Sequence, residues 1–245
     1  MGWGGMRSGI RGKEAALAER ELNLLARGLR GLCAGRVSEE KWVLAPSLRI
    51  GMQWLDAVTR SGQPVLNARV KTLAGMALEL AAPEMERRGL TFARGLRLEL
   101  LVDSLLRRRR DGGGYLARLE MTPGLARVAA ASLADLRLAG VAAGSLSPAR
   151  FEVAAKGREI ADLLSAYERE LSSRRLADLA EVLGLAAERL REYPESLPPD
   201  CVVALPEDML EKRCARERAL WEAVPEPRRV LLGSERPCEE RAGEA

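Results

Sequence analysis

The stretch KWVLAPSLRIGMQWLDAVTR, Lys41 to Arg60, contains the pattern that decides the fold. Its first part, Lys41–Ala45, is mostly apolar and stops at a proline, which is typical of a short β-strand. From residue 48 to residue 60, apolar residues recur on one face at helical spacing, and Ser47 is placed to cap the first turn. A strand therefore leads directly into an amphipathic helix.

The same order recurs immediately downstream. Val65–Thr72, VLNARVKT, is predicted to form a second strand, which is partly exposed because Asn67 and Arg69 interrupt its apolar residues. A helix over Leu73–Leu80 follows directly, and Pro83 marks where that helix can no longer continue regularly. Strand, helix, strand and helix in succession predict a parallel sheet covered by helices.

Two short apolar runs near the other end of the chain complete the predicted sheet. Cys201–Leu205 and Arg229–Leu232 have the length and composition of buried parallel strands. Between the two pairs of strands the sequence has helical periodicity, broken by glycine and proline. Helices are expected ahead of the first strand, over Glu14–Cys33, and in the region between the pairs, over Leu90–Arg110, Gly124–Gly140, Ala154–Ser173 and Leu176–Tyr193.

These elements predict an α/β fold in which a parallel-sheet domain contains an inserted all-helical domain. The sequence has no repeat of fixed period that would indicate a solenoid instead. The expected organisation is a flexible N-terminus over residues 1–13, the first half of the sheet domain over 14–83, the helical insertion over 84–195, the second half of the sheet domain over 196–234, and a polar tail over 235–245.

The composition is that of a soluble globular protein, because 47% of the 245 residues are hydrophobic and 30% are charged. No apolar run approaches the roughly 20 residues that a membrane span needs, so no membrane partner is expected. The chain has no histidine, and Cys33, Cys201, Cys214 and Cys238 are scattered. These features disfavour zinc and disulfides, indicate a reducing cytoplasm, and remove the commonest general base. No cofactor, metal or catalytic residue is predicted.

The net charge is +4, and arginine greatly outnumbers lysine. Arginine binds phosphate with a planar fork of donors, which suits a nucleic-acid partner. A genome with GC-rich codons produces the same bias without such a partner, and this is the simpler explanation. Charge by itself therefore assigns no function.

Two motifs in the strand–helix units resemble the UvrD/RecB helicase superfamily: APSLRIGMQWLDAV after the first strand and ARVKTLAGMALELA across the second. The likeness is strongest to AddB-like helicase–nuclease subunits, which carry a C-terminal nuclease domain of the PD-(D/E)XK family. In that superfamily the turns after these strands line the path of single-stranded DNA. The resemblance therefore implies DNA contacts at Pro46, Ser47, Arg49, Lys71 and Thr72. Without the resemblance, the same turns would be interpreted as helix caps.

The same resemblance aligns the run VVALPEDM, Val202–Met209, with a nucleotide-site strand of the superfamily. In the superfamily this strand ends in Asp-Glu, which hold magnesium and a catalytic water, and an aromatic residue and Gln-Asp follow. Here Ala204 and Leu205 replace the two acids, while Glu207 and Asp208 take the Gln-Asp positions. Neither replacement can hold magnesium or orient a water.

Two further nucleotide motifs are degenerate. The fourth strand keeps the family's glycine as Gly233 but has Ser234 in place of an aspartate. The string nearest to a phosphate-binding loop, SGIRGKE at residues 8–14, lacks the loop's first glycine and its hydroxyl residue. The resemblance therefore implies a RecA-like domain, of the P-loop NTPase kind, that has lost its nucleotide motifs.

A second match to the superfamily lies in the helical region. Tyr167-Glu-Arg-Glu-Leu and the stretch LADLAEVL, Leu176–Leu183, resemble its tyrosine helix and its DFDDLL-like motif. Asp178 and Glu181 keep the shape of that motif, whereas Ala180 departs from it. The resemblance implies that these residues close the insertion and return the chain to the sheet, although a plain amphipathic helix would look nearly the same.

Four consecutive arginines occupy the end of one predicted helix, at Arg107, Arg108, Arg109 and Arg110. Cations at a helix C-terminus interact favourably with the helix dipole, and this is the common meaning of such a run. The less common meaning is a basic tip that contacts the phosphates of duplex DNA. Both interpretations stay open at this point.

The sequence thus predicts a non-catalytic N-terminal module of an AddB-like helicase–nuclease, which acts in double-strand break repair and recombination by binding single-stranded or tailed DNA and scaffolding a nuclease. Longer family members continue into a second RecA-like domain and the nuclease, so a truncated or separately encoded piece is expected. The alternative is an interaction scaffold that docks a helicase or nuclease subunit and binds little or no DNA. An enzyme that uses Glu207 and Asp208 directly is disfavoured, because adjacent residues of an extended chain point to opposite faces.

Overall fold

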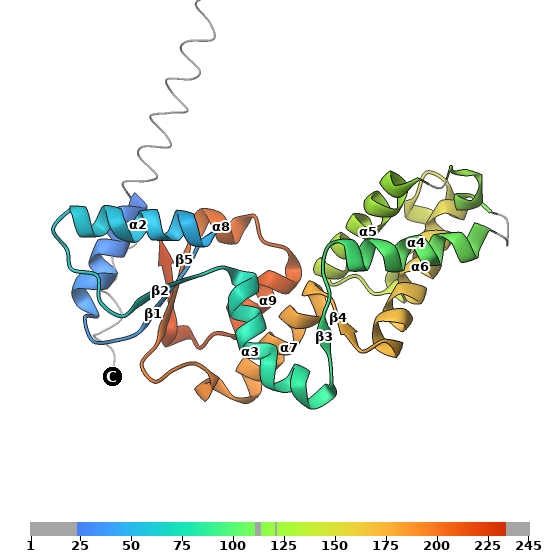
Figure 1. The fold of residues 1–245 in the computed structure, drawn as a ribbon. Helices are drawn as coiled ribbons and strands as arrows, with labels where there is room; N and C mark the ends of the chain where they lie inside the picture. Colours follow the sequence, from blue (N-terminus) through green and yellow to red (C-terminus); the bar gives the residue numbers. More distant parts are fainter. Residues whose placement is uncertain (1–23, 111–113, 121, 234–245) are drawn as a thin grey trace, which may run out of the picture. The chain divides into compact units, whose positions relative to one another are not determined.

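The computed structural model describes residues 24–110, 114–120 and 122–233, which form two compact units (Figure 1). The first, which we call the sheet unit, takes its described residues from the ranges 24–73, 197–213 and 224–233. The second, the helical unit, comprises Ala74–Ser196 and Cys214–Ala223.

The sheet unit contains one parallel sheet in the order β2-β1-β5-β6. Its strands are β1 (Lys41–Leu44), β2 (Ala68–Lys71), β5 (Val202–Pro206) and β6 (Arg229–Leu232). The α/β class and the parallel pairing of the four predicted strands are therefore confirmed.

The burial of each strand follows its place in the sheet. β1 and β5 lie in the middle and are buried at every residue, whereas the edge strands β2 and β6 are only partly buried. A central parallel strand is covered on both faces, which is why its sequence is continuously apolar. All four strands run in the same direction, but β1 leads to β2 on one side of the sheet and β5 leads to β6 on the other, so the order in which strands are added across the sheet reverses between β1 and β5.

One face of the sheet is covered by two helices. The helix over residues 24–35 contributes Leu29 and Leu32, and α2 (Leu48–Arg60) contributes Leu55 and Val58. These side chains form one hydrophobic cluster with residues of the strands beneath, namely Val43, Val202, Ala204 and Leu232. The amphipathic pattern that predicted α2 is therefore the pattern of its contact with the sheet, and the predicted bounds of α2 are confirmed.

Gly51 allows α2 to approach the sheet closely. A Cβ atom at this residue would lie 2.2 Å from Cγ1 of Val70 and 2.8 Å from Cβ of Ala45. Those separations are far below van der Waals contact, so any side chain would push the first half of α2 away from β1 and β2. The lack of a side chain thus sets the height of the helix above the strands.

Lys41 is fully buried at the start of β1. Its Nζ donates hydrogen bonds to the carbonyl oxygens of Arg36 and of Glu39, the latter at 2.6 Å. A buried ammonium is costly unless it is hydrogen-bonded, so these carbonyls must stay in place for the strand to pack. The side chain thereby ties residues 36–39 to the sheet.

The helical unit packs around a core between three helices, α4 (Leu96–Arg110), α5 (Pro123–Leu138) and α6 (Ala154–Ser173). Val102, Leu133, Leu164 and Tyr167 are among its most deeply buried side chains. The unit also contains most of α3 (Leu73–Arg88), together with β3 (Thr91–Phe92), β4 (Leu176–Ala177), α7 (Leu179–Glu192) and α9 (Ala215–Ala223).

The prediction that residues 84–195 are all helical is wrong. β3 and β4 pair in parallel, with Thr91 opposite Leu176 and Phe92 opposite Ala177. The predicted helices over Leu90–Arg110 and Leu176–Tyr193 consequently begin later, at α4 and α7. Pairs as short as these have no periodicity that a sequence pattern could reveal.

Two further expectations differ from the structure. α3 continues through Pro83 to Arg88, and Pro83 lies on the exposed side of the helix, where water can solvate the backbone around its missing N–H. Residues 74–83 and 214–223, expected in the sheet domain, cluster with the helical unit instead. Among the described residues, no helix is both long and apolar enough to cross a lipid bilayer.

The contact at Gly51 predicts opposite effects for two glycine-to-alanine substitutions. Gly51→Ala is expected to lower the free energy of unfolding by about 1–3 kcal/mol, because overpacking against Val70 outweighs the better helix propensity of alanine. Gly31→Ala, in the helix over residues 24–35, is the matched control. A methyl group there meets no described atom within 4 Å, so a gain of about 0.5–1 kcal/mol is expected.

Urea unfolding followed by circular dichroism measures both values. A Gly51→Ala protein as stable as the parent would show that α2 is free to move away from the strands, contrary to the packing described above.

Candidate functional site at the carboxyl edge of the sheet

The parallel strands bring the predicted site residues to one edge of the sheet. Pro46 and Ser47 follow β1, Lys71 ends β2 and Thr72 follows it, and Gly233 follows β6. Because carboxyl ends of parallel strands share an edge, these segments are neighbours in space although they are distant in sequence. We call this the carboxyl edge.

The turn after β1 opens α2. Pro46 is exposed, and the hydroxyl of Ser47 accepts a hydrogen bond from the backbone N–H of Ile50 at 3.3 Å, which caps the helix. α2 has no acidic residue in its first turn, so the positive end of its dipole is not neutralised locally. Arg49 is exposed in the same turn and makes no ion pair with any other described residue.

Lys71 is held in place by an aromatic ring. Its Nζ lies 4.0 Å from the centroid of the Trp42 ring, a cation–π contact between neighbouring strands. Trp42 is buried, and its Nε1 donates to Oε1 of Glu40 at 2.9 Å. The Ala45 backbone N–H donates to the Lys71 carbonyl at 2.9 Å and keeps the ends of β1 and β2 together.

The end of β5 carries no catalytic acid. Ala204 and Leu205 are buried inside the strand, which continues one residue further than predicted, to Pro206. Glu207 and Asp208 are exposed in the first turn of the short helix α8 (Glu207–Glu211), not on an extended turn as expected. Acidic residues in a first helical turn complement the helix dipole, which gives this pair a structural explanation.

The fourth strand ends at a glycine in the left-handed region of φ. Gly233 has φ +93, a conformation that glycine adopts without the steric cost other residues meet. It lies directly after β6, at the same edge as the residues above. The adjoining Ser234 lies outside the described residues.

The arginine run at the end of α4 is largely neutralised by carboxylates. Arg107 Nε lies 2.7 Å from Oδ2 of Asp103, and Arg108 Nη1 lies 2.8 Å from Oε1 of Glu170. Arg109 lies 3.8 Å from a carboxylate oxygen on α6, that of Asp162. Arg110 is the last residue of α4. These pairs make the run a salt-bridged helix end, which favours the more common of the two meanings considered above.

Tyr167 and Asp178, the two anchors of the second motif match, meet in the core of the helical unit. Asp178 caps α7 by accepting from the Glu181 N–H at 3.0 Å, and its Oδ2 also lies 3.5 Å from the Tyr167 hydroxyl. Burial, together with the nearby Asp178 charge, raises the pKa of Tyr167, so its phenol stays protonated.

Arg137 completes this cluster and was not predicted from the sequence. Its Nε and Nη2 donate to the two oxygens of Asp178 at 2.6 and 3.3 Å, and its Nη1 donates to Glu168 at 3.0 Å. A paired arginine–carboxylate contact of this kind joins α5, α6 and α7. No local sequence signal marks Arg137, because its partner stands on a different helix.

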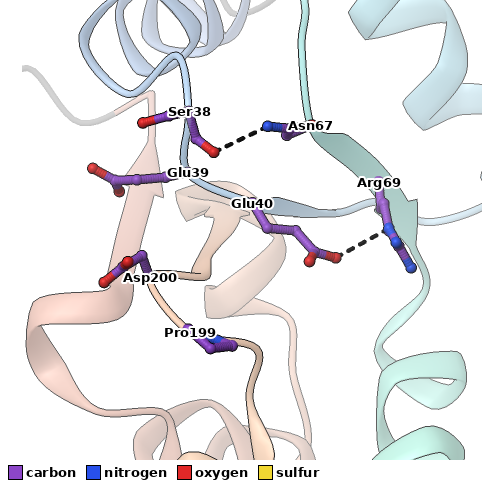
Figure 2. A pocket seen from close by; sticks show the side chains of 7 residues that line it. All are labelled: Ser38, Glu39, Glu40, Asn67, Arg69, Pro199 and Asp200. Carbon is purple, nitrogen blue, oxygen red and sulfur yellow. Dashed lines mark hydrogen bonds and ion pairs between the residues drawn. The ribbon is translucent and has the colours of Figure 1, made fainter.

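A pocket of about 400 Å³ lies at the opposite edge of the sheet, before the strands begin (Figure 2). Glu40 points at Arg69, and their charged groups are 3.0 Å apart, while Nδ2 of Asn67 donates to the Ser38 carbonyl at 3.0 Å. The lining is polar and comprises Ser38, Glu39, Glu40, Asn67, Arg69, Pro199 and Asp200.

The sequence did not reveal this pocket, and its place in the sheet argues against a nucleotide. In doubly wound sheets, ligands bind at the carboxyl ends of the strands, whereas this pocket lies at the amino ends. Asn67 and Asp200 turn the chain with φ +52 and φ +54, so the local polar residues already have a role in the turns. Burial, with a smaller effect from Glu40, raises the pKa of the neighbouring Cys201 thiol to about 12.

Comparison of the chain with protein-family models finds no match, and comparison with curated proteins finds none either. Within the described parts of the chain, histidine, cysteine and acidic side chains do not form a group of three or more that could hold a metal ion. The carboxyl edge offers helix-terminal amides, a hydroxyl and two cations.

The buried Asp178 predicts a large loss of stability on substitution. Asp178→Ala is expected to lower the free energy of unfolding by about 3–5 kcal/mol, because it leaves the half-buried Arg137 without its main partner and removes the cap of α7. Asp162→Ala is the matched control, since that carboxylate is 69% exposed and lies 3.8 Å from Arg109. Its expected effect is below about 0.5 kcal/mol.

Thermal and urea unfolding of both variants measure the difference. Equal stabilities would show that the cluster around Arg137 adds nothing to the helical unit. An Asp178→Asn protein, which can still accept the Glu181 N–H, separates the loss of the cap from the loss of charge.

Proposed function

We propose that the chain is a non-catalytic DNA-binding module, built as a RecA-like sheet domain with an inserted helical domain and acting as the N-terminal part of an AddB-like helicase–nuclease. The observation that carries the proposal is the carboxyl edge, where cations and helix-terminal amides stand beside a central strand that ends without acids. In this proposal the module acts in the cytoplasm, in double-strand break repair and recombination.

The topology supports the RecA-like part of the proposal. All strands of the sheet are parallel, and the chain between β2 and β5 builds most of a separate compact unit. The strand order reverses between β1 and β5, and the carboxyl ends of the strands at such a reversal are where sheets of this kind bind their ligands. A sheet interrupted by a helical unit is the arrangement that the resemblance implies.

The carboxyl edge supports phosphate binding. Backbone N–H groups at the start of α2 point out of the helix, with a hydroxyl at Ser47 and the exposed guanidinium of Arg49 next to them. Lys71, half-buried on the Trp42 ring, adds a second cation from the neighbouring strand. Donors of this kind contact the phosphates of nucleic acid and do not read its base sequence, as expected of a protein that binds DNA of any sequence.

The same edge supports the absence of nucleotide turnover. Magnesium takes oxygen ligands, and the side chains of Ala204 and Leu205 have none. Both are fully buried, so no nearby water can enter their places without opening the sheet. In this proposal the sheet domain is a motor domain whose third strand has lost the acids that would support ATP hydrolysis.

A second candidate function is a protein-interaction scaffold that binds little or no DNA and docks a helicase or nuclease subunit. The observation that favours it is the solvent-facing side of α2, where Leu48 and Met52, four residues apart, are exposed by 59% and 58%. Apolar side chains that lie together on an exposed surface are typical of a protein contact. DNA binding by the purified chain distinguishes the two candidates.

The proposal predicts that two cations at the carboxyl edge control DNA binding. The double substitution Arg49→Gln and Lys71→Met is expected to weaken binding of a fluorescein-labelled single-stranded oligonucleotide and to reduce the slope of log affinity against log salt by roughly 1–2. Methionine keeps an apolar stem on the Trp42 ring, so the sheet should stay intact.

The matched control is Arg60→Gln with Lys156→Met, which removes the same charge from the far end of α2 and from the exposed side of α6. Fluorescence anisotropy between 50 and 200 mM salt, a range over which phosphate contacts change affinity by orders of magnitude, measures all three proteins. Equal losses in both double variants would remove the carboxyl edge from the proposal. A parent chain that retains no DNA would favour the scaffold.

The buried apolar end of β5 predicts that the chain does not hydrolyse ATP. Phosphate release by the purified chain, with and without single-stranded or tailed DNA, is expected to equal that of buffer. ATPase activity that co-elutes with the chain on gel filtration would contradict this, whereas activity that separates from it would be a contaminant.

A further inference from the structure

A groove of about 300 Å³ runs along α4 in the helical unit. Its walls come from α4 and from the segment that follows α6, and its lining residues are Arg97, Leu100, Leu101, Ser104, Arg174 and Leu176. We call it the α4 groove. It belongs to no site described above.

α4 is apolar on two sides. Leu101, Val102 and Leu105 are buried in the core of the helical unit, as expected for one face of an amphipathic helix. Leu96 and Leu100, however, are 67% and 60% exposed, and a spacing of four residues places them next to each other on the helix surface. Packing inside the helical unit does not account for these two leucines.

The border of the α4 groove is basic. Arg97 is exposed at its edge, Arg94 is exposed one turn before it, and neither makes an ion pair with another described residue. Arg174 lies on the opposite wall and is 53% exposed, with Nε 2.8 Å from Oε2 of Glu170. An occupant that buries the leucines would therefore meet positive charge at its border, so its own charge should be negative.

We propose that the α4 groove is a docking site for an amphipathic helix of a partner protein, with leucine-like residues on one face and Asp or Glu beside them. Helices bind grooves of this kind by inserting apolar side chains at i, i+3, i+4 and i+7. The volume is at the lower end of the range for small-molecule pockets, which suits side chains better than a whole ligand. Leu96 and Leu100 extend the apolar surface along the helix axis.

The exposed leucines favour a protein over nucleic acid as the occupant. Phosphates need donors and cations, and Leu96 and Leu100 offer neither. A base-stacking surface would use aromatic rings, and the groove is lined by leucine, arginine and serine. This inference does not depend on DNA binding at the carboxyl edge, because the α4 groove and that edge are built from different residues.

The test uses a synthetic helical peptide, labelled with fluorescein, that has leucine at i, i+3, i+4 and i+7 and glutamate on its flanks. Its affinity for the full chain is measured by fluorescence anisotropy. Leu96→Ser with Leu100→Ser is expected to weaken binding roughly tenfold or more, since each leucine loses its burial in the complex. Arg97→Glu should weaken binding as well, and a peptide with lysine in place of glutamate should bind less tightly than the acidic one.

The matched control is Val37→Ser with Leu66→Ser. These two residues lie in the sheet unit, outside its helices and strands, and are 52% and 54% exposed, so the variant removes a similar exposed apolar surface elsewhere. Its peptide affinity should equal that of the parent. Circular dichroism melts of both variants check that neither substitution, made at exposed residues, changes the fold.

Four results would overturn the proposal. The first is the absence of peptide binding at about 100 µM, a concentration that would detect even weak complexes, and the second is an equal loss of peptide affinity in the two double variants. The third is competition by a single-stranded oligonucleotide that depends on Arg97 but not on the leucines, which would make the groove a nucleic-acid surface. The fourth is a dimer in sedimentation velocity that Leu96→Ser with Leu100→Ser abolishes, which would make the occupant a second copy of the chain.

Discussion

Backbone pairing of β1 with β2 on one side and with β5 on the other is the constraint on which the sheet unit depends. Both pairings are parallel, so backbone pairing alone brings the residues that follow each strand to one edge of the sheet, whatever their side chains. The Ala45–Lys71 hydrogen bond extends the ladder beyond the end of β1 and aligns the two turns after it. The carboxyl edge is therefore a product of main-chain geometry, on which side-chain chemistry is then placed.

Three buried residues around β1 maintain this geometry. Lys41 ties the loop before the strand to its first residue, and Trp42 holds the cation of the neighbouring strand. Gly51 sets the height of α2, and with it the direction in which the first-turn amides of that helix point. Each of them acts within a few ångströms of β1, which explains why so small a sheet can position its edge residues well.

The pattern of strands and long helices could be predicted from the sequence, because each of these elements has its own periodicity. α2 and α6 begin and end where their amphipathic patterns do, and the four strands are apolar runs bounded by turns. β3 and β4 could not be predicted, since each has only two residues and each exists only because the other is beside it. Pro83 misled for a related reason: exposure on the surface of α3 decides whether a proline breaks a helix, and exposure is not visible in a sequence.

In the candidate site, too, local features could be predicted from the sequence and contacts between distant residues could not. The turns at Pro46 and Lys71 are local features, so their place at strand ends could be predicted, and the loss of acids at Ala204 and Leu205 is visible in the letters alone. The interaction partners of the charged residues could not be predicted from the sequence. Trp42 beneath Lys71, Arg137 beside Asp178, and the carboxylates that neutralise the arginine run all come from other elements.

The position of β1 between strands from both ends of the chain has a consequence for biosynthesis. Its partner β2 leaves the ribosome soon after it, but β5 is made only after the residues that form most of the helical unit. During translation β1 and β2 must therefore wait as an incomplete pair with one unsatisfied edge, while the core between α4, α5 and α6, which is made entirely before β5, can already fold. The nascent chain should be most vulnerable to aggregation in that interval, and a chaperone that covers the open side of β1 would protect it.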